Sequence, residues 1–133
     1  MTVTIYAGNS WVLELAPGWT GRSEDDAEVL YHPEGAGALR ISAARKEHPV
    51  TDADLQGFAA QHTQESARAA AAQCGEFSGY RYGIEGESIL VRQWFLRAGT
   101  RALFLTYNCS LEHAGQDDAA LDAMLDTLSL VED

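Results

Sequence analysis

The chain has 133 residues, of which 46% are hydrophobic and 22% charged, so we expect a single domain, residues 1–133, with its own core. The formal net charge of −11 would repel phosphate backbones and anionic lipid, which argues against nucleic acid and membrane surfaces as partners. No apolar run reaches the length of a transmembrane helix.

The first third of the sequence predicts three short strands. The predicted strands are residues 11–15, 28–32 and 38–46. Pro17-Gly18 and the segment 33–37 carry the proline and glycine residues that are typical of turns. Residues 20–27 are polar, and we expect a loop there.

A long helix is predicted to follow. Thr51 can cap its N-terminus, and Asp52 and Asp54 complement the positive end of the helix dipole. Asp54 stands where a capping box carries Glu or Gln, so the box is imperfect. We expect the helix to reach about residue 73 and to end at Gly75.

The second half of the sequence predicts a central β-hairpin. Residues 87–110 read as two apolar strands around a turn in which Gly99 can adopt positive φ. A weaker strand is expected at 76–84. Leucines at helical spacing predict a second amphipathic helix that opens at residues 116–118 and ends near Leu130.

These elements predict an α+β fold in the order βββ-α-βββ-α. The short links within each group of strands favour antiparallel pairing, and the helices stand between and after the groups. We therefore expect one antiparallel sheet of about six strands with both helices packed on it.

The order of elements also resembles a known superfamily. The landmarks are Leu15-Ala16-Pro17-Gly18-Trp19, the segment 37–42, Leu105-Thr106-Tyr107 and the closing helix 121–130. With these landmarks the chain resembles the PsbP-like superfamily, which includes the extrinsic protein of photosystem II, the yeast Ran-binding nuclear-import factor, DcrB-type bacterial proteins and chaperone-adaptors of type VI secretion effectors. The resemblance implies an α/β/α sandwich in proteins that mostly bind other proteins and are mostly not enzymes.

The sequence has no spacing that is typical of a catalytic centre. His-x-x-x-His, Cys-x-x-Cys and Gly-x-Ser-x-Gly are all absent, so we predict no catalytic residues, no metal and no cofactor. Asp25-Asp26 could hold a divalent cation, but a solvated loop is the better interpretation. Cys74 and Cys109 are expected to be free thiols, with a disulfide as the alternative.

Basic and aromatic residues share the predicted strands. Arg81 stands between Tyr80 and Tyr82, and Arg92 stands beside Trp94. Arginine and large aromatic residues are enriched where proteins bind one another. The predicted protein-binding residues are Arg40, Tyr80, Tyr82, Arg92 and Trp94. The alternative is that the arginines pair with acidic loops or solvate strand edges.

We therefore expect a non-catalytic protein-binding module. The resemblance implies an adaptor, chaperone or immunity-type protein of a bacterial secretion system; its partner is another protein, and a homodimer is left open. The N-terminus lacks the pattern of a leader, which favours the cytoplasm. The second hypothesis is a small-ligand-binding protein or enzyme that uses His62, with an acid such as Glu65, in a pocket between the long helix and the sheet.

Overall fold

The computed structural model describes residues 3–62 and 68–131, apart from the side chains of His62 and Arg68. The strands are β1 (Ile5–Ala7), β2 (Trp11–Glu14), β3 (Thr20–Glu24), β4 (Ala27–Tyr31), β5 (Gly37–Arg45), β6 (Arg68–Cys74), β7 (Phe77–Glu85), β8 (Ile89–Ala98), β9 (Arg101–Ser110) and β10 (Ser129–Leu130). The helices are α1 (Asp52–His62), a short 3-10 helix η1 (Leu111–His113) and α2 (Asp118–Leu125).

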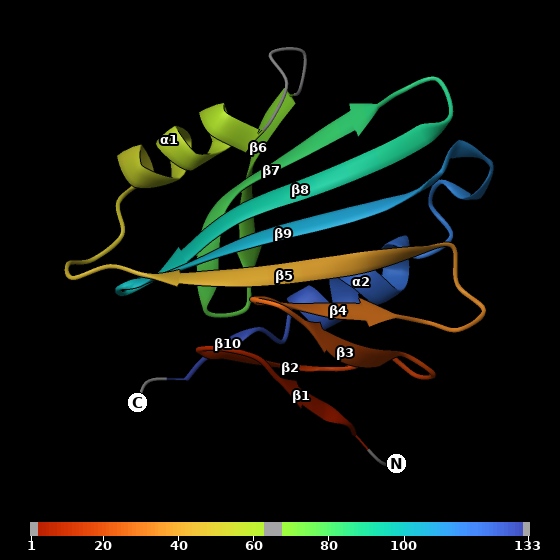
Figure 1. Ribbon diagram of the computed structural model, residues 1–133, viewed down its shortest axis with the longest axis horizontal. Helices are drawn as coiled ribbons and strands as arrows, with labels where there is room; N and C mark the ends of the chain where they lie inside the picture. Colours follow the sequence, from red (N-terminus) through yellow and green to blue (C-terminus); the bar gives the residue numbers. More distant parts are fainter. Residues whose placement is uncertain (1–2, 63–67, 132–133) are drawn as a thin grey trace.

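The strands form two antiparallel sheets. The larger has seven strands in the order β3-β4-β5-β9-β8-β7-β6, and the smaller has three in the order β1-β2-β10. Helix α1 lies on one face of the large sheet, which we call the α1 face, and α2 lies on the other, the α2 face (Figure 1). The small sheet packs on the α2 face beside α2, because both contribute to the same core.

Side-chain alternation along β9 supplies both faces of the large sheet. Leu103 and Leu105 point to the α2 face, and Ala102 and Phe104 point to the α1 face. The α2 face carries the main core, in which residues of β2 and α2 meet those of β5, β8 and β9. Its fully buried members include Trp11, Leu13, Leu39, Leu96, Leu103, Leu105, Leu121 and Met124.

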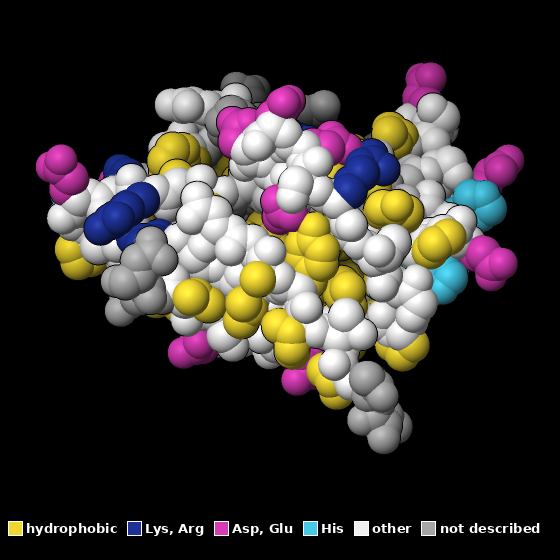
Figure 2. Space-filling view, turned by 60° about the horizontal axis from the view of Figure 1, so that its bottom comes forward, with side chains coloured by type: hydrophobic (Ala, Val, Ile, Leu, Met, Phe, Trp, Pro, Cys, Tyr) yellow, Lys and Arg dark blue, Asp and Glu magenta, His cyan; other side chains and the backbone are white. Residues whose placement is uncertain are grey.

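The small sheet turns part of its apolar surface outward. Among the described residues, the exposed large hydrophobic side chains include Val3 and Ile5, before and in β1, and Val131, directly after β10. Figure 2 shows hydrophobic side chains gathered over this side of the molecule. Because β1 and β10 flank β2 on its two sides, segments from the two ends of the described chain share this surface.

The expected α+β class, with one sheet of about six strands, is wrong. The fold is mostly β, and its strands form two sheets in place of one. The small sheet and α2 together cover one face, so the α/β/α sandwich is also wrong. The resemblance to the PsbP-like superfamily stays a prediction.

The main reason for the error is the predicted helix over 51–73. Helix α1 is half that long, and the alanine-rich segment that begins at Arg68 is strand β6. Alanine is a strong helix former, but pairing with β7 outweighs this preference. The turn between the two strands contains Gly75 at φ 60°, a conformation that glycine adopts without strain.

Three further strands were not predicted: β1, β3 and β10. Strand β3 is polar because it is an edge strand, and the turn to β4 includes Asp25 at φ 42°. The predicted C-terminal helix ends at Leu125 instead of Leu130, because Ser129 and Leu130 pair with β2. The predicted hairpin is confirmed: β8 and β9 pair in register around Gly99, whose φ is 57°.

Candidate functional site

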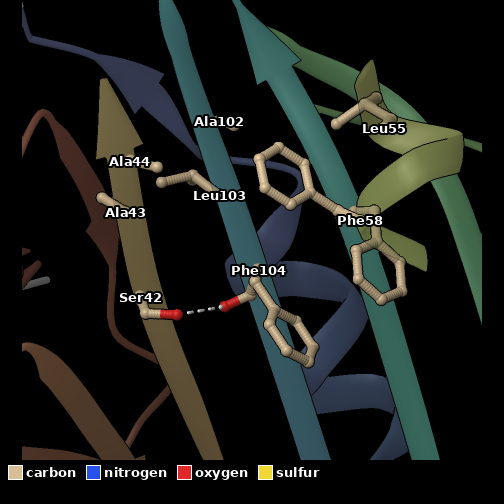
Figure 3. Close-up of a pocket in the computed structure, with 9 residues that line it drawn as sticks. Ser42, Ala43, Ala44, Leu55, Phe58, Ala102, Leu103 and Phe104 are labelled. Carbon is tan, nitrogen blue, oxygen red and sulfur yellow. Dashed lines mark hydrogen bonds between the residues drawn. The ribbon is translucent and has the colours of Figure 1, made fainter. Parts of the chain in front are cut away.

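An apolar pocket of about 180 Å³ lies between α1 and the large sheet. Figure 3 shows Leu55 and Phe58 reaching from α1 toward the sheet, with Phe104 below them and Ser42, Ala43 and Ala44 on the opposite side. Among the described residues, the lining is Ser42, Ala43, Ala44, Leu55, Phe58, Phe95, Ala102, Leu103 and Phe104. Of these nine residues, Ser42 alone has a polar side chain.

The aromatic rings of the pocket are packed against the sheet. The rings of Phe95 and Phe104 stack with their centroids 4.8 Å apart and an interplanar angle of 20°. Tyr82 meets Phe95 edge to face at 5.6 Å. These arrangements are favourable for aromatic pairs, so the three rings support one another against the sheet.

Small side chains on β5 and β9 leave the space that the rings do not fill. Ala102 is buried at the base of the pocket, and Ala44 is exposed on β5. The hydroxyl of Ser42 donates to the carbonyl oxygen of Phe104 at 3.4 Å, so it is used within the sheet. An apolar cavity of about 150 Å³ holds a benzene molecule in other proteins, so this pocket has room for about one ring.

The N-terminus of α1 is fixed by a reciprocal cap. The backbone N–H of Asp54 donates to Thr51 Oγ1 at 3.2 Å, and the N–H of Thr51 donates to Asp54 Oδ2 at 3.0 Å. Lys46 Nζ forms an ion pair with Asp54 Oδ1 at 3.0 Å and lies 5.6 Å from the centroid of the Phe58 ring. The hydrogen bond from the Thr51 N–H, followed by that from Lys46, lowers the pKa of Asp54 to about 2.

A second anchor ties α1 to the turn between β8 and β9. Arg97 Nη2 lies 2.8 Å from Asp52 Oδ1, and Arg97 Nη1 donates to the carbonyl oxygen of Val50 at 3.2 Å. The N–H of Val50 donates to the carbonyl oxygen of Gly99 at 2.8 Å. Both ends of the segment that leads into α1 are therefore held, and this fixes Leu55 and Phe58 over the sheet.

An arginine and tyrosine surface continues from the pocket along the α1 face. Arg40 on β5 and Arg22 on β3 both pair with Glu24, at 3.2 and 2.6 Å. The Arg22 guanidinium also lies 5.4 Å from the centroid of the Tyr31 ring. The side chains of Arg22 and Arg40 remain about half exposed, at 59% and 48%. We call Arg22, Tyr31 and Arg40 the arginine surface.

The structure divides the five predicted binding residues between the two faces. Arg40, Tyr80 and Tyr82 belong to the α1 face, where the tyrosines pack against the small core under α1. Trp94 is only 3% exposed and belongs to the main core on the α2 face. Arg92 lies 4.8 Å from the Trp94 ring centroid on that same face.

Two of the predicted binding arginines pair with acidic side chains, as the alternative interpretation of the sequence expects. Arg92 Nη1 lies 2.9 Å from Asp118, and its Nη2 lies 3.6 Å from Asp122, both on α2. Arg40 pairs with Glu24 as described above. These arginines therefore connect strands to acidic side chains, and their role in binding another protein stays a prediction.

The two residues of the second sequence hypothesis, His62 and Glu65, can be placed only in part. His62 is the last residue of α1, but its side chain and the whole of Glu65 lie outside the described residues. Across residues 3–62 and 68–131, no three His, Cys, Asp or Glu side chains are grouped to hold a metal ion. Cys74 and Cys109 are free and buried, which confirms the expected thiols.

Sequence reasoning missed the pocket residues Phe58 and Phe104. Phe58 lies within the predicted long helix and Phe104 within the predicted hairpin, but nothing in their spacing shows that they would meet. The signal that could have found the site is the run of small side chains at Ser42, Ala43 and Ala44, directly after the larger side chains of residues 39–41.

Comparisons with known proteins identify the fold alone. No protein-family model and no curated protein matches the chain. A crystal structure from Bacteroides thetaiotaomicron is similar, with a TM-score of 0.69 and 14% identity; the match covers 98% of this chain and 48% of that one. This chain thus spans about half the length of that protein.

A second solved structure is similar over nearly the whole of both chains. It is LpqN, described as involved in cell envelope biogenesis of Mycobacterium tuberculosis. The TM-score is 0.66 and the identity 14%, and the match covers 98% of this chain and 91% of LpqN. In the described part of the chain, no helix is both long enough and apolar enough to cross a bilayer.

Proposed function

We propose that this protein is a non-catalytic binding module that receives an apolar side chain of a partner protein in the pocket under α1. The observation that carries the proposal is the pocket itself, which Phe58, Phe95 and Phe104 line and which α1 holds open at a fixed position. Buried aromatic anchors in preformed pockets supply much of the affinity at protein interfaces.

The size of the pocket defines the group that fits. A cavity of about 180 Å³ accommodates one aromatic ring or one branched aliphatic side chain, but not a larger cofactor. Burying a phenylalanine or leucine side chain contributes about 1.5–3 kcal/mol. This energy suits one anchor residue within a larger interface.

The arginine surface suits the residues that would flank such an anchor. Arg22 and Arg40 share one carboxylate, Glu24, so this part of the α1 face keeps a net positive charge in a chain whose net charge is −11. We infer that the partner carries acidic residues beside its apolar anchor. A role as an adaptor, chaperone or immunity-type protein of a secretion system, in the cytoplasm, belongs to the same proposal and rests on the sequence alone.

The same pocket supports a second candidate function. A free small apolar molecule could fill it without any partner protein. The apolar lining, with a single hydroxyl that is already hydrogen bonded to the Phe104 carbonyl, favours an aromatic or aliphatic compound over a polar one.

A comparison of probes separates the two candidates. Two probes would be compared: indole, and a peptide in which a single phenylalanine has two glutamates on each side. NMR chemical-shift changes at Phe58 and Phe104 would measure the binding of each probe. We expect the peptide to bind at least ten-fold more tightly than indole, and to weaken as salt rises. Tighter binding of indole would favour the small-molecule function.

Filling the pocket provides the matched control. Ala44→Phe places a ring in the pocket from an exposed position on β5, whereas Ala60→Phe adds the same ring on the exposed side of α1. We expect Ala44→Phe to abolish peptide binding and Ala60→Phe to leave it unchanged. Binding that survives Ala44→Phe would contradict the proposal.

A further inference from the structure

Strand β6 has an open edge. It is the last strand of the large sheet and pairs only with β7 among the described strands. Cys74 and Phe77 close the two-residue turn, so hydrogen-bonded pairs recur at every second residue along β6. The backbone N–H and C=O groups of Ala69, Ala71 and Gln73 therefore point away from β7, toward the open edge.

Past its first residue, Arg68, the side chains of this edge strand do not discourage pairing. Residues 69–71 are three exposed alanines, and no proline or charged residue stands between Ala69 and Cys74. The opposite edge of the sheet, β3, carries the charged side chains of Arg22 and Glu24. Charges and prolines are the usual protection of edge strands, so β6 is open to an added strand in a way that β3 is not.

The small side chains of β6 leave a hollow on each face of the sheet. On the α1 face, a hollow of about 420 Å³ is lined by Ala71, Tyr80 and the ion pair between Asp52 and Arg97. Neither hollow shares its lining with the pocket under α1. Side chains of a strand added at β6 would alternate between the two faces and could reach across the alanines.

The hollow on the α2 face is acidic. It measures about 350 Å³ and is lined by Cys74, Arg81, Asp122 and Asp126, with Trp94 at its base. Asp122 pairs with Arg92, and Asp126 makes no ion pair in the described structure. Burial first, and then the negative charges of Asp126 and Asp122, raise the pKa of the Cys74 thiol to about 11, against smaller opposing effects of Arg81 and Arg92. The carboxylate of Asp126, which lines the hollow without an ion pair in the described part of the chain, is therefore the group that a cationic side chain would meet.

We propose that β6 is a docking edge for an extended segment of a partner protein, which adds to the large sheet as an eighth strand. Its side chains alternate between lysine or arginine, directed to the acidic hollow, and apolar residues, directed to Tyr80. Backbone hydrogen bonds to Ala69, Ala71 and Gln73 hold it, and the two hollows select its side chains. A second copy of this chain fits less well, because the alanines of its own β6 are too small to fill either hollow.

The proposal is tested with a fluorescent peptide in which lysine alternates with phenylalanine and valine. Fluorescence anisotropy would measure its affinity, and amide hydrogen exchange would report on Ala69, Ala71 and Gln73. We expect saturable binding that slows exchange at these three amides. A peptide with glutamate in place of every lysine should bind at least ten-fold more weakly.

Two pairs of variants give the controls. Ala71→Pro removes one N–H that points to the open edge but breaks no hydrogen bond to β7, so we expect the affinity for the lysine peptide to fall about ten-fold or more. Ala71→Ser keeps this N–H, and we expect its affinity for the peptide to be unchanged. Asp126→Asn should weaken binding several-fold at low salt, whereas Asp25→Asn, in the turn before β4, should not.

Three results would overturn the proposal. The first is equal affinity for the lysine and glutamate peptides, and the second is unchanged affinity of Ala71→Pro in a protein that keeps its circular dichroism spectrum. The third is a dimer in light scattering that Ala71→Pro converts to monomer, since this would assign the edge to a second copy. The pocket under α1 is not used in any of these measurements, so failure here leaves the proposed function standing.

Discussion

The phenol oxygen of Tyr107 on β9 donates a hydrogen bond of 2.7 Å to Oδ2 of Asp117, the residue that precedes α2. Asp117 Oδ2 also accepts hydrogen bonds from the backbone N–H groups of Ala36 at 3.3 Å and Gly37 at 3.1 Å. Tyr107 and Asp117 are both buried, and burial followed by this hydrogen bond raises the pKa of Tyr107. One oxygen thus joins β9, the start of β5 and the start of α2.

Removing this contact should destabilise the fold. We expect Tyr107→Phe to lower the free energy of unfolding by about 1–3 kcal/mol, because the buried carboxylate of Asp117 loses a donor. We expect Asp117→Ala to lower it by more than about 2 kcal/mol, because the Tyr107 hydroxyl and two backbone N–H groups lose their acceptor. Urea unfolding followed by circular dichroism would measure both. The neighbouring Asp118→Asn is the control: its ion pair with Arg92 is half exposed and should cost less than about 1 kcal/mol.

Asp54 should make the stability of α1 sensitive to acid. Its pKa is lowered from the ordinary 3.8 to about 2, so the folded state binds this proton more weakly than the unfolded state does. The stabilisation is therefore present above about pH 4 and is lost as the pH falls toward 2. A carboxyl titration by NMR should show the low pKa, and Lys46→Met should raise it. An ordinary pKa of Asp54 in the unmutated protein would contradict the hydrogen bonds described for this cap.

Glycine substitutions should have opposite effects at two sites. Gly75 has φ 60°, and a Cβ there would meet the backbone of Leu128, so we expect Gly75→Ala to destabilise the fold by about 1–3 kcal/mol. A Cβ on Gly57 in α1 would meet nothing within 4 Å, so Gly57→Ala should stabilise it by about 0.5–1 kcal/mol. Thermal unfolding of both variants measures the two signs, and destabilisation by Gly57→Ala would be inconsistent with an exposed helix site.

The buried Cys74 thiol should be inert at neutral pH. Its pKa is raised from 9.0 to about 11, chiefly by burial, so the folded state holds the proton more tightly than the unfolded state does. We expect this contribution to stability to disappear as the pH rises from about 9 to 11. Labelling with a thiol reagent should be slow in the folded protein and fast in urea, and Asp126→Asn should lower the pKa. Rapid labelling of the folded protein would show that the structure around Cys74 opens to solvent.

The parts of the fold that sequence could predict are those in which local pattern and final environment agree. The hairpin of β8 and β9 combines apolar alternation with Gly99 at its turn, so the pattern alone was sufficient. Thr51 was correctly identified as the cap of α1, and Asp54 completes the box although it is one methylene shorter than glutamate. Both features depend on residues that are close together in the chain.

The parts that sequence missed depend on contacts between distant segments. Ala69 and its neighbours favour a helix in isolation, and only the pairing with β7 makes them a strand. The pocket under α1 needs Phe58 and Ser42 to face each other from different elements, which no local pattern encodes. Arg92 looked like part of a surface, but α2 places Asp118 and Asp122 beside it.

The pairing of β10 with β2 has a consequence for the order of events during synthesis. Val12 meets Ser129, and Trp11 meets Leu130, across nearly the whole length of the chain. A growing chain on the ribosome can form the β8–β9 hairpin early, but it cannot complete the small sheet until residues 129–130 have left the exit tunnel. Until then β2, which carries Trp11, lacks one of its two neighbouring strands. We therefore expect the apolar residues on this side of a nascent chain to stay exposed longest.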